Sequence, residues 1–216
     1  MSISTSMTDY YQERAPEYED FYHKPERQAD QEALKLWFKE EVKGCSVLEI
    51  ACGTGYWTAV AAPVVHFFQA TDFNTAPMEI ARAKCLGDHV RFMRADAYNL
   101  PEFDTAFDCG MANFWWSHVL LSDQQRFLSG FVSKLQKGAK ILMIDNNNVA
   151  GSTIPVTRKD EHGNTYQRRT TSSGKEYEVV KNFPGTAEIE AAFAPHCSTV
   201  NVRQSNYFWA VSAIAN

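Results

Sequence analysis

The pattern of hydrophobic and polar positions changes character about one fifth of the way along the chain. Before that point, tyrosines recur at spacings of seven and four (Tyr11, Tyr18 and Tyr22), which places their rings on one face of a helix running from about residue 8 to residue 22. A second helix is expected between Pro25 and Gly44, where the glycine ends it. The first 44 residues are therefore predicted to be helical.

From residue 46 onward, short apolar runs alternate with amphipathic stretches. The apolar runs predict strands and the amphipathic stretches predict helices. This alternation is typical of a parallel sheet covered by helices on both faces, with right-handed crossovers. The expected strands are 46–50, 64–72, 89–96, 107–113 and 139–145, and the helices between them end near Pro63, span 76–85, and run from an N-cap at Ser122 to a C-cap at Gly138.

Residues 146–184 interrupt the alternation and are polar, and their segments 163–169 and 175–180 are expected to pair as a hairpin. Beyond them, 196–204 and 206–214 flank a short polar turn and predict a second, antiparallel hairpin that completes the sheet. The chain is thus predicted to be one α/β domain over 1–216. The expected fold is Rossmann-like and doubly wound, with a mostly parallel seven-stranded sheet, an antiparallel C-terminal strand, an N-terminal helical lid (1–44) and a β-hairpin insertion on the substrate side (146–184).

Composition narrows the class of protein. A chain of 216 residues is long enough for one core, and its net charge of −5 disfavours a nucleic-acid partner. The N-terminus lacks the apolar run of a signal peptide, and the longest apolar runs fall short of a membrane span. The five cysteines form no CxxC pair, which predicts free thiols in a reducing compartment and no metal site. We expect a cytoplasmic protein that acts without membrane or metal.

The loop after the first expected strand, from Glu49 to Trp57, indicates the kind of ligand. Ligands of open α/β sheets bind beyond the carboxyl ends of the strands. Gly53 and Gly55 allow a tight turn and close approach of the backbone. Thr58 stands where a dinucleotide fingerprint has its third glycine, and no Gly-Lys-Ser/Thr follows, which excludes a P-loop. A carboxylate at Glu49 would repel a pyrophosphate but would tolerate or favour a cation.

Acidic residues also follow the next two expected strands. Asp72 can accept two hydrogen bonds from a ribose diol, and Asp96 can accept from an exocyclic amine. Phe73 and Met78 are apolar groups able to flank a flat base. The combination favours a ligand with an adenosine, a positive centre and no phosphate, a description that S-adenosylmethionine fits.

The pattern Glu-x-Ala-Cys-Gly-Thr-Gly at 49–55, with Asp72 after the second strand and Asp96-Ala97 after the third, resembles the class I S-adenosylmethionine-dependent methyltransferases over residues 46–145. The resemblance implies methyl transfer from S-adenosylmethionine, with S-adenosylhomocysteine as product. The residues expected to bind this cofactor are Tyr11, Arg14, Glu49, Ala51, Gly53, Gly55, Trp57, Asp72, Phe73, Met78, Asp96, Ala97, Tyr98 and Asn113.

In that family the loop after the fourth strand lies beside the methyl group. Here it carries Asn113, three aromatic residues and His118. Asn113 is expected at the methionine end of the cofactor, while Trp115 and Trp116 wall the acceptor pocket, exclude water and favour the sulfonium. His118, whose pKa ordinarily lies near neutrality, is the candidate general base. Alternatively, the tryptophans pack in the core and His118 caps the next helix.

The N-terminal stretch 10–22 belongs to the same picture. An amphipathic helix with its tyrosines on one face can fold across the cofactor as a lid. Arg14 would then meet a carboxylate of the cofactor or of the acceptor. The alternative is a solvated surface helix whose rings pack on the sheet.

A narrower resemblance concerns the acceptor. Six stretches resemble the C-terminal methyltransferase domain of ovothiol synthase, the bifunctional 5-histidylcysteine sulfoxide synthase and mercaptohistidine methyltransferase. This resemblance implies methylation of an imidazole nitrogen of 5-thiohistidine, giving an ovothiol, and functional coupling to a sulfoxide synthase or lyase. The iron-dependent upstream domains of that enzyme have no counterpart in this sequence. The matching stretches are 10–30, 47–58, 114–119, 144–155, 160–169 and 179–184.

A thiohistidine carries a thiolate that is a softer nucleophile than the ring nitrogen, so selectivity must come from orientation. The pocket then needs an anion for the ammonium group and cations or amides for the carboxylate. Two alternatives stay open: a methyltransferase for another amine, amino acid or amino sugar, and a non-catalytic module that binds S-adenosylmethionine. The candidate substrate-binding residues are Tyr18, Trp115, Trp116, His118, Asp145, Asn147, Tyr166, Arg168, Lys181 and Asn182, with Arg169 beside them.

Overall fold

The computed structural model describes residues 6–216. The first five residues, which we assigned to the N-terminal lid region and to the stretch without a signal-peptide pattern, lie outside the described residues. Within 6–216, no helix has both the length and the apolar character that a membrane span requires.

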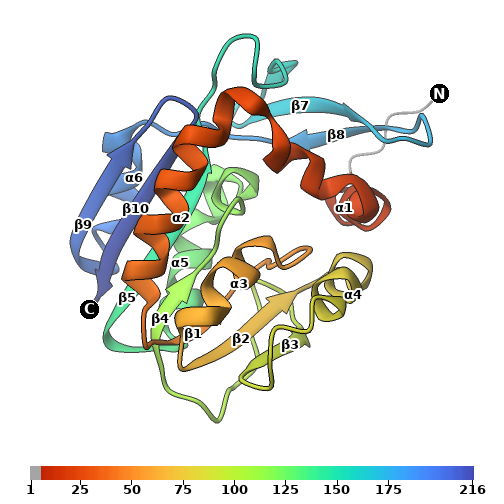
Figure 1. Ribbon diagram of the computed structural model, residues 1–216. Coiled ribbons are helices and arrows are strands. Elements are labelled where there is room, and N and C mark those ends of the chain that lie inside the picture. Colours follow the sequence, from red (N-terminus) through yellow and green to blue (C-terminus); the bar gives the residue numbers. More distant parts are fainter. Residues whose placement is uncertain (1–5) are drawn as a thin grey trace.

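A seven-stranded sheet with the order β3-β2-β1-β4-β5-β10-β9 forms the centre of the molecule (Figure 1). Strands β1 to β5 are parallel, and β10 runs antiparallel to both β5 and β9. The predicted Rossmann-like sheet and its antiparallel C-terminal hairpin are thus confirmed. The strands are β1 (Ser46–Glu49), β2 (Phe67–Asp72), β3 (Val90–Arg94), β4 (Phe107–Met111), β5 (Leu135–Asn146), β9 (Cys197–Gln204) and β10 (Phe208–Ala215).

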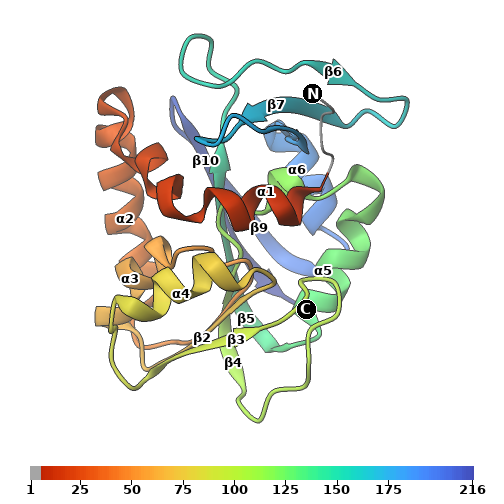
Figure 2. The ribbon, with the colours of Figure 1, turned by 90° about the vertical axis from the view of Figure 1, so that its right-hand side faces the viewer.

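Helices cover both faces of this sheet (Figures 1 and 2). Side chains of a strand alternate between the faces, so Val47 packs with α2 and α3 while its neighbour Leu48 packs with α5 and α6. Two apolar clusters result, one on each face. The α-helices are α1 (Met7–Arg14), α2 (Gln28–Val42), α3 (Tyr56–Ala61), α4 (Thr75–Ala83), α5 (Gln124–Val132) and α6 (Thr186–Phe193).

Two predicted element boundaries are wrong. The helix expected between Ser122 and Gly138 ends at Val132, and β5 already begins at Leu135. Leu135 pairs with Phe107 of β4, and its side chain fills the space that the missing side chain of Gly110 leaves open. Gly138, at a φ of +79°, lies inside the strand and caps no helix. Ser122 lies in a short 3₁₀ turn and does not cap α5.

The N-terminal stretch also differs from the single helix that we expected. It is α-helical to Arg14 and continues as a 3₁₀ helix from Ala15 to His23, with Pro16 in its first turn. The tyrosine rings still follow one another in edge contacts, at 5.9 Å for Tyr11 and Tyr18. We call residues 7–23 the lid, because they cross above the carboxyl ends of β1 to β4 (Figure 1).

The insertion, residues 146–184, contains the predicted hairpin and one further strand. β7 (Thr165–Thr170) pairs with β8 (Glu176–Val180), and the short β6 (Arg158–Lys159) joins β7. This small sheet lies over α1 (Figure 2), where Tyr177 of β8 packs against Tyr10 of α1 at 5.4 Å between ring centroids. Glu13 of the lid accepts hydrogen bonds from Thr171, Ser173 and Tyr177. The insertion therefore fastens the lid from above.

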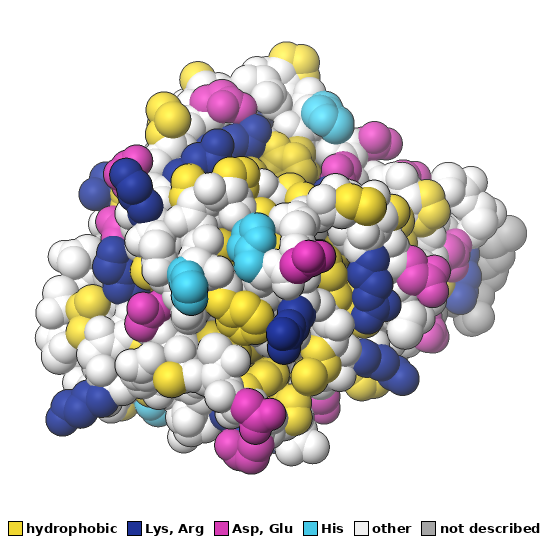
Figure 3. Space-filling view, turned by 60° about the horizontal axis from the view of Figure 1, so that its bottom comes forward, with side chains coloured by type: hydrophobic (Ala, Val, Ile, Leu, Met, Phe, Trp, Pro, Cys, Tyr) yellow, Lys and Arg dark blue, Asp and Glu magenta, His cyan; other side chains and the backbone are white. Residues whose placement is uncertain are grey.

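The opposite side of the lid is fastened to α4. The N–H of Ala76 donates to the Gln12 side chain, and Lys84 forms an ion pair with Glu19. The lid thus spans from α4 to the insertion. On the face drawn in Figure 3, which lies at the lower side of Figure 1, acidic and basic side chains are interspersed and apolar side chains lie between them.

Candidate active site

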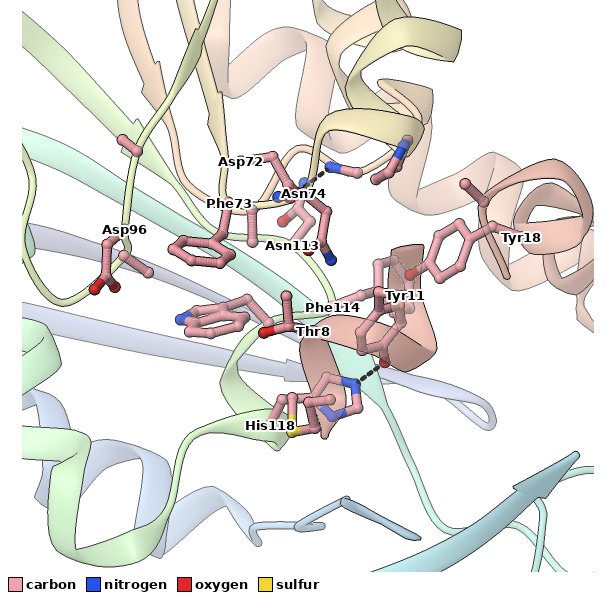
Figure 4. A pocket seen from close by; sticks show the side chains of 18 of the residues that line it. Thr8, Tyr11, Tyr18, Asp72, Phe73, Asn74, Asp96, Asn113, Phe114 and His118 are labelled. Atoms are coloured by element: carbon pink, nitrogen blue, oxygen red, sulfur yellow. Dashed lines mark hydrogen bonds between the residues drawn. The ribbon is translucent and has the colours of Figure 1, made fainter. Parts of the chain in front are cut away.

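A cavity of about 330 Å³ lies at the carboxyl ends of β1 to β4, beneath the lid (Figure 4). The strand order reverses between β1 and β4, which is where open α/β sheets form their binding crevice. Loops that follow four strands and the lid each contribute to the wall. Of the predicted site residues, the cavity is lined by Tyr11, Tyr18, Ala51, Gly53, Asp72, Phe73, Asp96, Ala97, Tyr98, Asn113, Trp115 and His118.

Backbone strain marks two of the strand exits. Ala51 after β1 and Phe114 after β4 have φ values of 55° and 58°, in the left-handed region that side chains other than glycine rarely adopt. Both residues line the cavity. Strain of this kind persists only where the surrounding structure enforces it, and it is concentrated at functional sites.

Asp72 ties two loops of the cavity together. Its carboxylate accepts from the Gly53 N–H and from the Asn74 N–H, each at 2.8 Å. Burial raises the pKa of Asp72 although these backbone hydrogen bonds favour the ionised form. An ionised carboxyl group with two backbone donors keeps acceptor capacity for a ligand diol.

Asp96 and Phe73 line the cavity on the side away from Tyr18 (Figure 4). One oxygen of Asp96 accepts from the Tyr98 N–H at 2.9 Å, which fixes the turn after β3. The Phe73 side chain is 46% exposed, a large apolar surface left open at the cavity edge. An uncovered ring beside a carboxylate suits a flat base that has an exocyclic amine.

Asn113 presents donors to the middle of the cavity. Its Oδ1 accepts from the Ile144 N–H at 3.0 Å, which fixes the orientation of the amide group. The Nδ2 atom is buried and has no hydrogen-bond partner among the described residues. Because Asn113 lines the cavity, this donor is available to a ligand.

His118 is held at both ring nitrogens. Nδ1 lies 2.6 Å from the carbonyl oxygen of Val180, which can only accept, so Nδ1 carries the proton. Nε2 therefore accepts from the Tyr11 hydroxyl at 2.7 Å, the bond drawn in Figure 4. Burial, with the charge of Lys181, lowers the pKa of His118 to about 3. The imidazole is neutral and orients Tyr11, whereas we expected a free general base.

Five residues expected at the cofactor do not line the cavity: Arg14, Glu49, Gly55, Trp57 and Met78. Glu49 is buried beneath the loop, accepts from the Thr58 hydroxyl, and has its pKa raised by burial to about 8. Its environment suppresses the negative charge on which our electrostatic argument depended. Gly55 packs against Ala81 of α4, where a Cβ would come within 2.8 Å of the Ala81 Cβ. Trp57 and Met78 are buried and are absent from the lining.

A second group of predicted residues forms an ion pair beneath the acceptor side. Lys181 and Asp145, both buried, are 2.9 Å apart, and Lys181 also donates to the Ser117 hydroxyl. The lysine holds the pKa of Asp145 below its usual range despite burial. Asn182 donates to the Val119 carbonyl. These residues lock the insertion onto the segment that carries His118 and do not themselves line the cavity.

The remaining predicted substrate residues lie farther away. Trp116 is in the core, in ring contact with Phe127 and Phe193, as the packing alternative predicted. The Tyr166 ring centroid lies 3.5 Å from the Cζ atom of Arg158, and Arg168 is exposed on the small sheet of the insertion. The Asn147 amide donates to the turn between β9 and β10. Arg14, which stacks on Tyr10 and Tyr18, is also outside the lining.

Several lining residues were missed. Met7 and Thr8 precede Tyr11 by one helical turn, so the helical spacing that singled out the tyrosines could have found them. Phe114 stands inside the aromatic run already noted, while Asn74 and Pro77 follow Asp72 in the same loop and helix start. Ala15 and Ala95 carry no distinguishing signal. Among residues 6–216, no group of three metal-ligating side chains is placed to hold an ion.

Known proteins resemble this chain in the region that forms the site. Residues 47–138 match the family described as "Methyltransferase domain". A demethylmenaquinone methyltransferase of Clavibacter sepedonicus is 30% identical over 119 residues, which are 55% of this chain and 46% of that protein. The chain thus matches about half the length of that relative. Its namesake from Staphylococcus aureus (strain MRSA252) is 26% identical over 204 residues, which are 85% of this chain and 82% of the relative.

Solved structures match over nearly the whole chain. DhpI in a complex with SAH has a TM-score of 0.80 at 22% identity, covering 97% of this chain and 95% of that one. A DhpI-SAM-HEP complex has a TM-score of 0.78 at 23% identity, covering 97% and 99%. The chain has the class I S-adenosylmethionine-dependent methyltransferase fold.

Proposed function

We propose that the protein is an S-adenosylmethionine-dependent methyltransferase that N-methylates the imidazole of a 5-thiohistidine. The observation that supports methyl transfer is the convergence of Gly53, Asp72, Asp96 and Asn113 on one cavity at the strand-order reversal. These residues come from four separate loops. Their donors and acceptors fit a nucleoside with an amino-acid end, and the site needs no phosphate-binding group.

Each residue has a defined task in this proposal. Asp72 would bind the ribose, Asp96 the adenine amine and the Asn113 amide the methionine end. When bound, the cofactor supplies an electrophilic methyl carbon. Phe114, Trp115 and the lid exclude water, and the Tyr11–His118 pair fixes a polar oxygen on the acceptor side. His118 acts by holding Tyr11 in place, because its own Nε2 is occupied.

The thiohistidine acceptor is supported by where the matching stretches fall. Stretches 10–30 and 160–169 lie in the lid and the insertion, and 114–119 carries His118. Residues of the lid and of 114–119 line the cavity, and the insertion holds both of these segments in place. A thiohistidine ring nitrogen can already be unprotonated at neutral pH, so the reaction depends on orientation more than on a base. A neutral His118 is compatible with that requirement.

The test is an acceptor screen with the purified protein and S-adenosylmethionine. We expect 5-thiohistidine to be methylated on the ring nitrogen, identified by fragment masses, while histidine and simple amines turn over much more slowly. Methylation on sulfur, or equal rates with simple amines, would contradict the acceptor assignment. Cofactor binding without acceptor-dependent formation of S-adenosylhomocysteine, for every acceptor tried, would indicate a non-catalytic binding module.

The relatives' names favour a second candidate, methylation of a demethylmenaquinone. The demethylmenaquinone methyltransferase of Staphylococcus aureus (strain MRSA252) matches 85% of this chain. A short-chain demethylmenaquinone therefore belongs in the same screen. Preferential methylation of that quinone would replace the thiohistidine proposal and leave the cofactor assignment intact.

A further inference from the structure

Several cations in and beside the lid and the insertion have no ion-pair partner. Arg14, Lys24, Arg27 and Arg169 have no carboxylate within 4.0 Å in the described part of the chain. Lys181 has one, Asp145, and that pair is complete. Buried or half-buried cations without a counter-ion are costly, and a bound anion would reduce that cost.

Two of these cations, which follow the lid in the chain, contact the insertion. Arg27 is buried, donates to Ser152 and Asn146, and stacks on Phe21. Lys24 donates to the Ser152 carbonyl. Both fix the start of the insertion against the lid. Arg14 and Arg169 remain as the two cations that do not fix the start of the insertion.

Arg169 is turned toward the lid by the register of the small sheet. It lies directly opposite Tyr177, so both side chains are on the same face. Tyr177 is buried against Tyr10 of α1, which identifies that face as the one facing the lid. The neighbouring Arg168 lies opposite Glu178 in the strand register and is exposed on the other face.

The guanidinium of Arg169 is incompletely satisfied. One terminal nitrogen donates to Gln167 at 2.5 Å, while Nε is buried and has no partner among residues 6–216. Arg14 approaches from the lid and donates to the Tyr10 phenol, with its guanidinium 5.8 Å from the Tyr18 ring. The positive charges of both arginines oppose the effect of burial, which raises the pKa of Tyr11.

We propose that Arg14 and Arg169 provide an oxyanion site at the Tyr11–Tyr18 end of the cavity, which selects acceptors that carry a carboxylate or a phosphonate-like group. The inference rests on the proposed function and extends it to the substrate class. Tyr11 and Tyr18 line the cavity, Arg14 lies over the Tyr18 ring, and Arg169 is on the lid-facing side of the small sheet. The anion therefore sits at the phenol side, within the field of two cations that have no ion-pair partner among the described residues.

Binding is measured by calorimetry and thermal shift on protein saturated with S-adenosylhomocysteine, so that no turnover is needed. The probes are 5-thiohistidine, its decarboxylated amine, acetate and methylphosphonate. We expect each anionic probe to stabilise the protein, and the amino acid to bind about tenfold more tightly than the amine. The acetate and methylphosphonate arms distinguish carboxylate from phosphonate recognition and do not depend on the thiohistidine assignment.

Arg169→Gln tests the site, and Arg168→Gln is its matched control, since it removes the same charge from the opposite face of the same strand. We expect Arg169→Gln to lose the anion stabilisation and about tenfold in amino-acid affinity, with cofactor affinity unchanged, while Arg168→Gln behaves like wild type. Arg14→Gln provides a second variant should Arg169→Gln fold poorly. The proposal is overturned if no anionic probe stabilises the wild type, or if all variants respond alike. If the anionic probes stabilise the protein but 5-thiohistidine is not methylated, only the acceptor assignment is contradicted.

Discussion

Two carboxylates, Glu49 at the end of β1 and Asp145 near the end of β5, are buried at strand ends of the same sheet and have opposite titration behaviour. Within residues 6–216, Glu49 has only the Thr58 hydroxyl as side-chain partner, and its pKa rises to about 8. Asp145 contacts Lys181 at 2.9 Å, and its pKa is lowered. Burial raises both pKa values, but the charge of Lys181 and the hydrogen bonds from Lys181 and Ser117 lower that of Asp145.

Glu49 lies beneath the cofactor end of the cavity and Asp145 beneath the acceptor end, so the two carboxylates represent two differently built ends. The cofactor end is assembled from short loops, each of which follows its own strand. Hydrogen-bonded partners at this end, such as Asp72 and Gly53, come from loops after neighbouring strands. The acceptor end depends on the lid, the strand-four loop and the insertion, which are far apart along the chain. Charge at the acceptor end is therefore compensated, or left uncompensated, by segments that only the tertiary fold brings together.

Lys181→Met should have the largest effect. It leaves Asp145 buried without a counter-ion and removes the donor to Ser117, so we expect a loss of about 3–5 kcal/mol in unfolding free energy. Urea denaturation measures it. The double variant Lys181→Met/Asp145→Asn should recover part of the loss, because no buried charge is left. A loss below about 1 kcal/mol in the single variant would remove the contrast between the two carboxylates.

Asp72→Ala should act at the other end of the cavity. Hydrogen bonds to a charged group contribute about 1.5–3 kcal/mol, so S-adenosylmethionine affinity should fall roughly tenfold to a hundredfold. Calorimetry gives the dissociation constant. Asp72→Asn is the control, since it keeps the side-chain shape and one oxygen that can accept from one of the two backbone N–H groups, Gly53 or Asn74. Unchanged affinity in Asp72→Ala would exclude this loop as the ribose site.

Tyr11→Phe should affect the acceptor end alone. It removes one neutral hydrogen bond to His118, worth about 1 kcal/mol, so we expect roughly a fivefold lower kcat/KM for the acceptor. Cofactor affinity should not change. Tyr22→Phe, a lid tyrosine outside the cavity lining, is the matched control. Equal losses in both variants would indicate that the lid acts only through packing.

Glu49→Gln should have the smallest effect. At pH 5 the wild-type carboxyl group is protonated, so the free energy of unfolding should change by no more than about 1 kcal/mol. The folded pKa of about 8 lies above the ordinary value, so the folded state binds more protons between pH 4.5 and 8. Wild-type stability therefore decreases through this range as pH rises. The stability advantage of Glu49→Gln should grow from pH 5 to 8.5 in denaturation curves.

His118 provides a titration of opposite sign. Its folded pKa of about 3 lies below its ordinary value, so its contribution is complete above about pH 6.5 and is lost as pH falls. His118→Gln should flatten the acid side of the stability profile, while Glu49→Gln flattens the alkaline side. A single variant that flattens both sides would contradict the separate origins of the two effects.

Local periodicity and residues adjacent in the chain were enough to predict the alternating strands and helices and the three acidic loop ends. The sequence placed Asp72, Asp96 and Asn113 correctly at one cavity wall, since carboxyl ends of parallel strands share one edge. Tertiary structure alone decided that Glu49 is buried, that Gly138 lies within a strand, and that Tyr11 occupies His118. Burial depth and tertiary partners depend on packing between separate segments, as for Tyr11 and His118, which are 107 residues apart, and no local pattern encodes them.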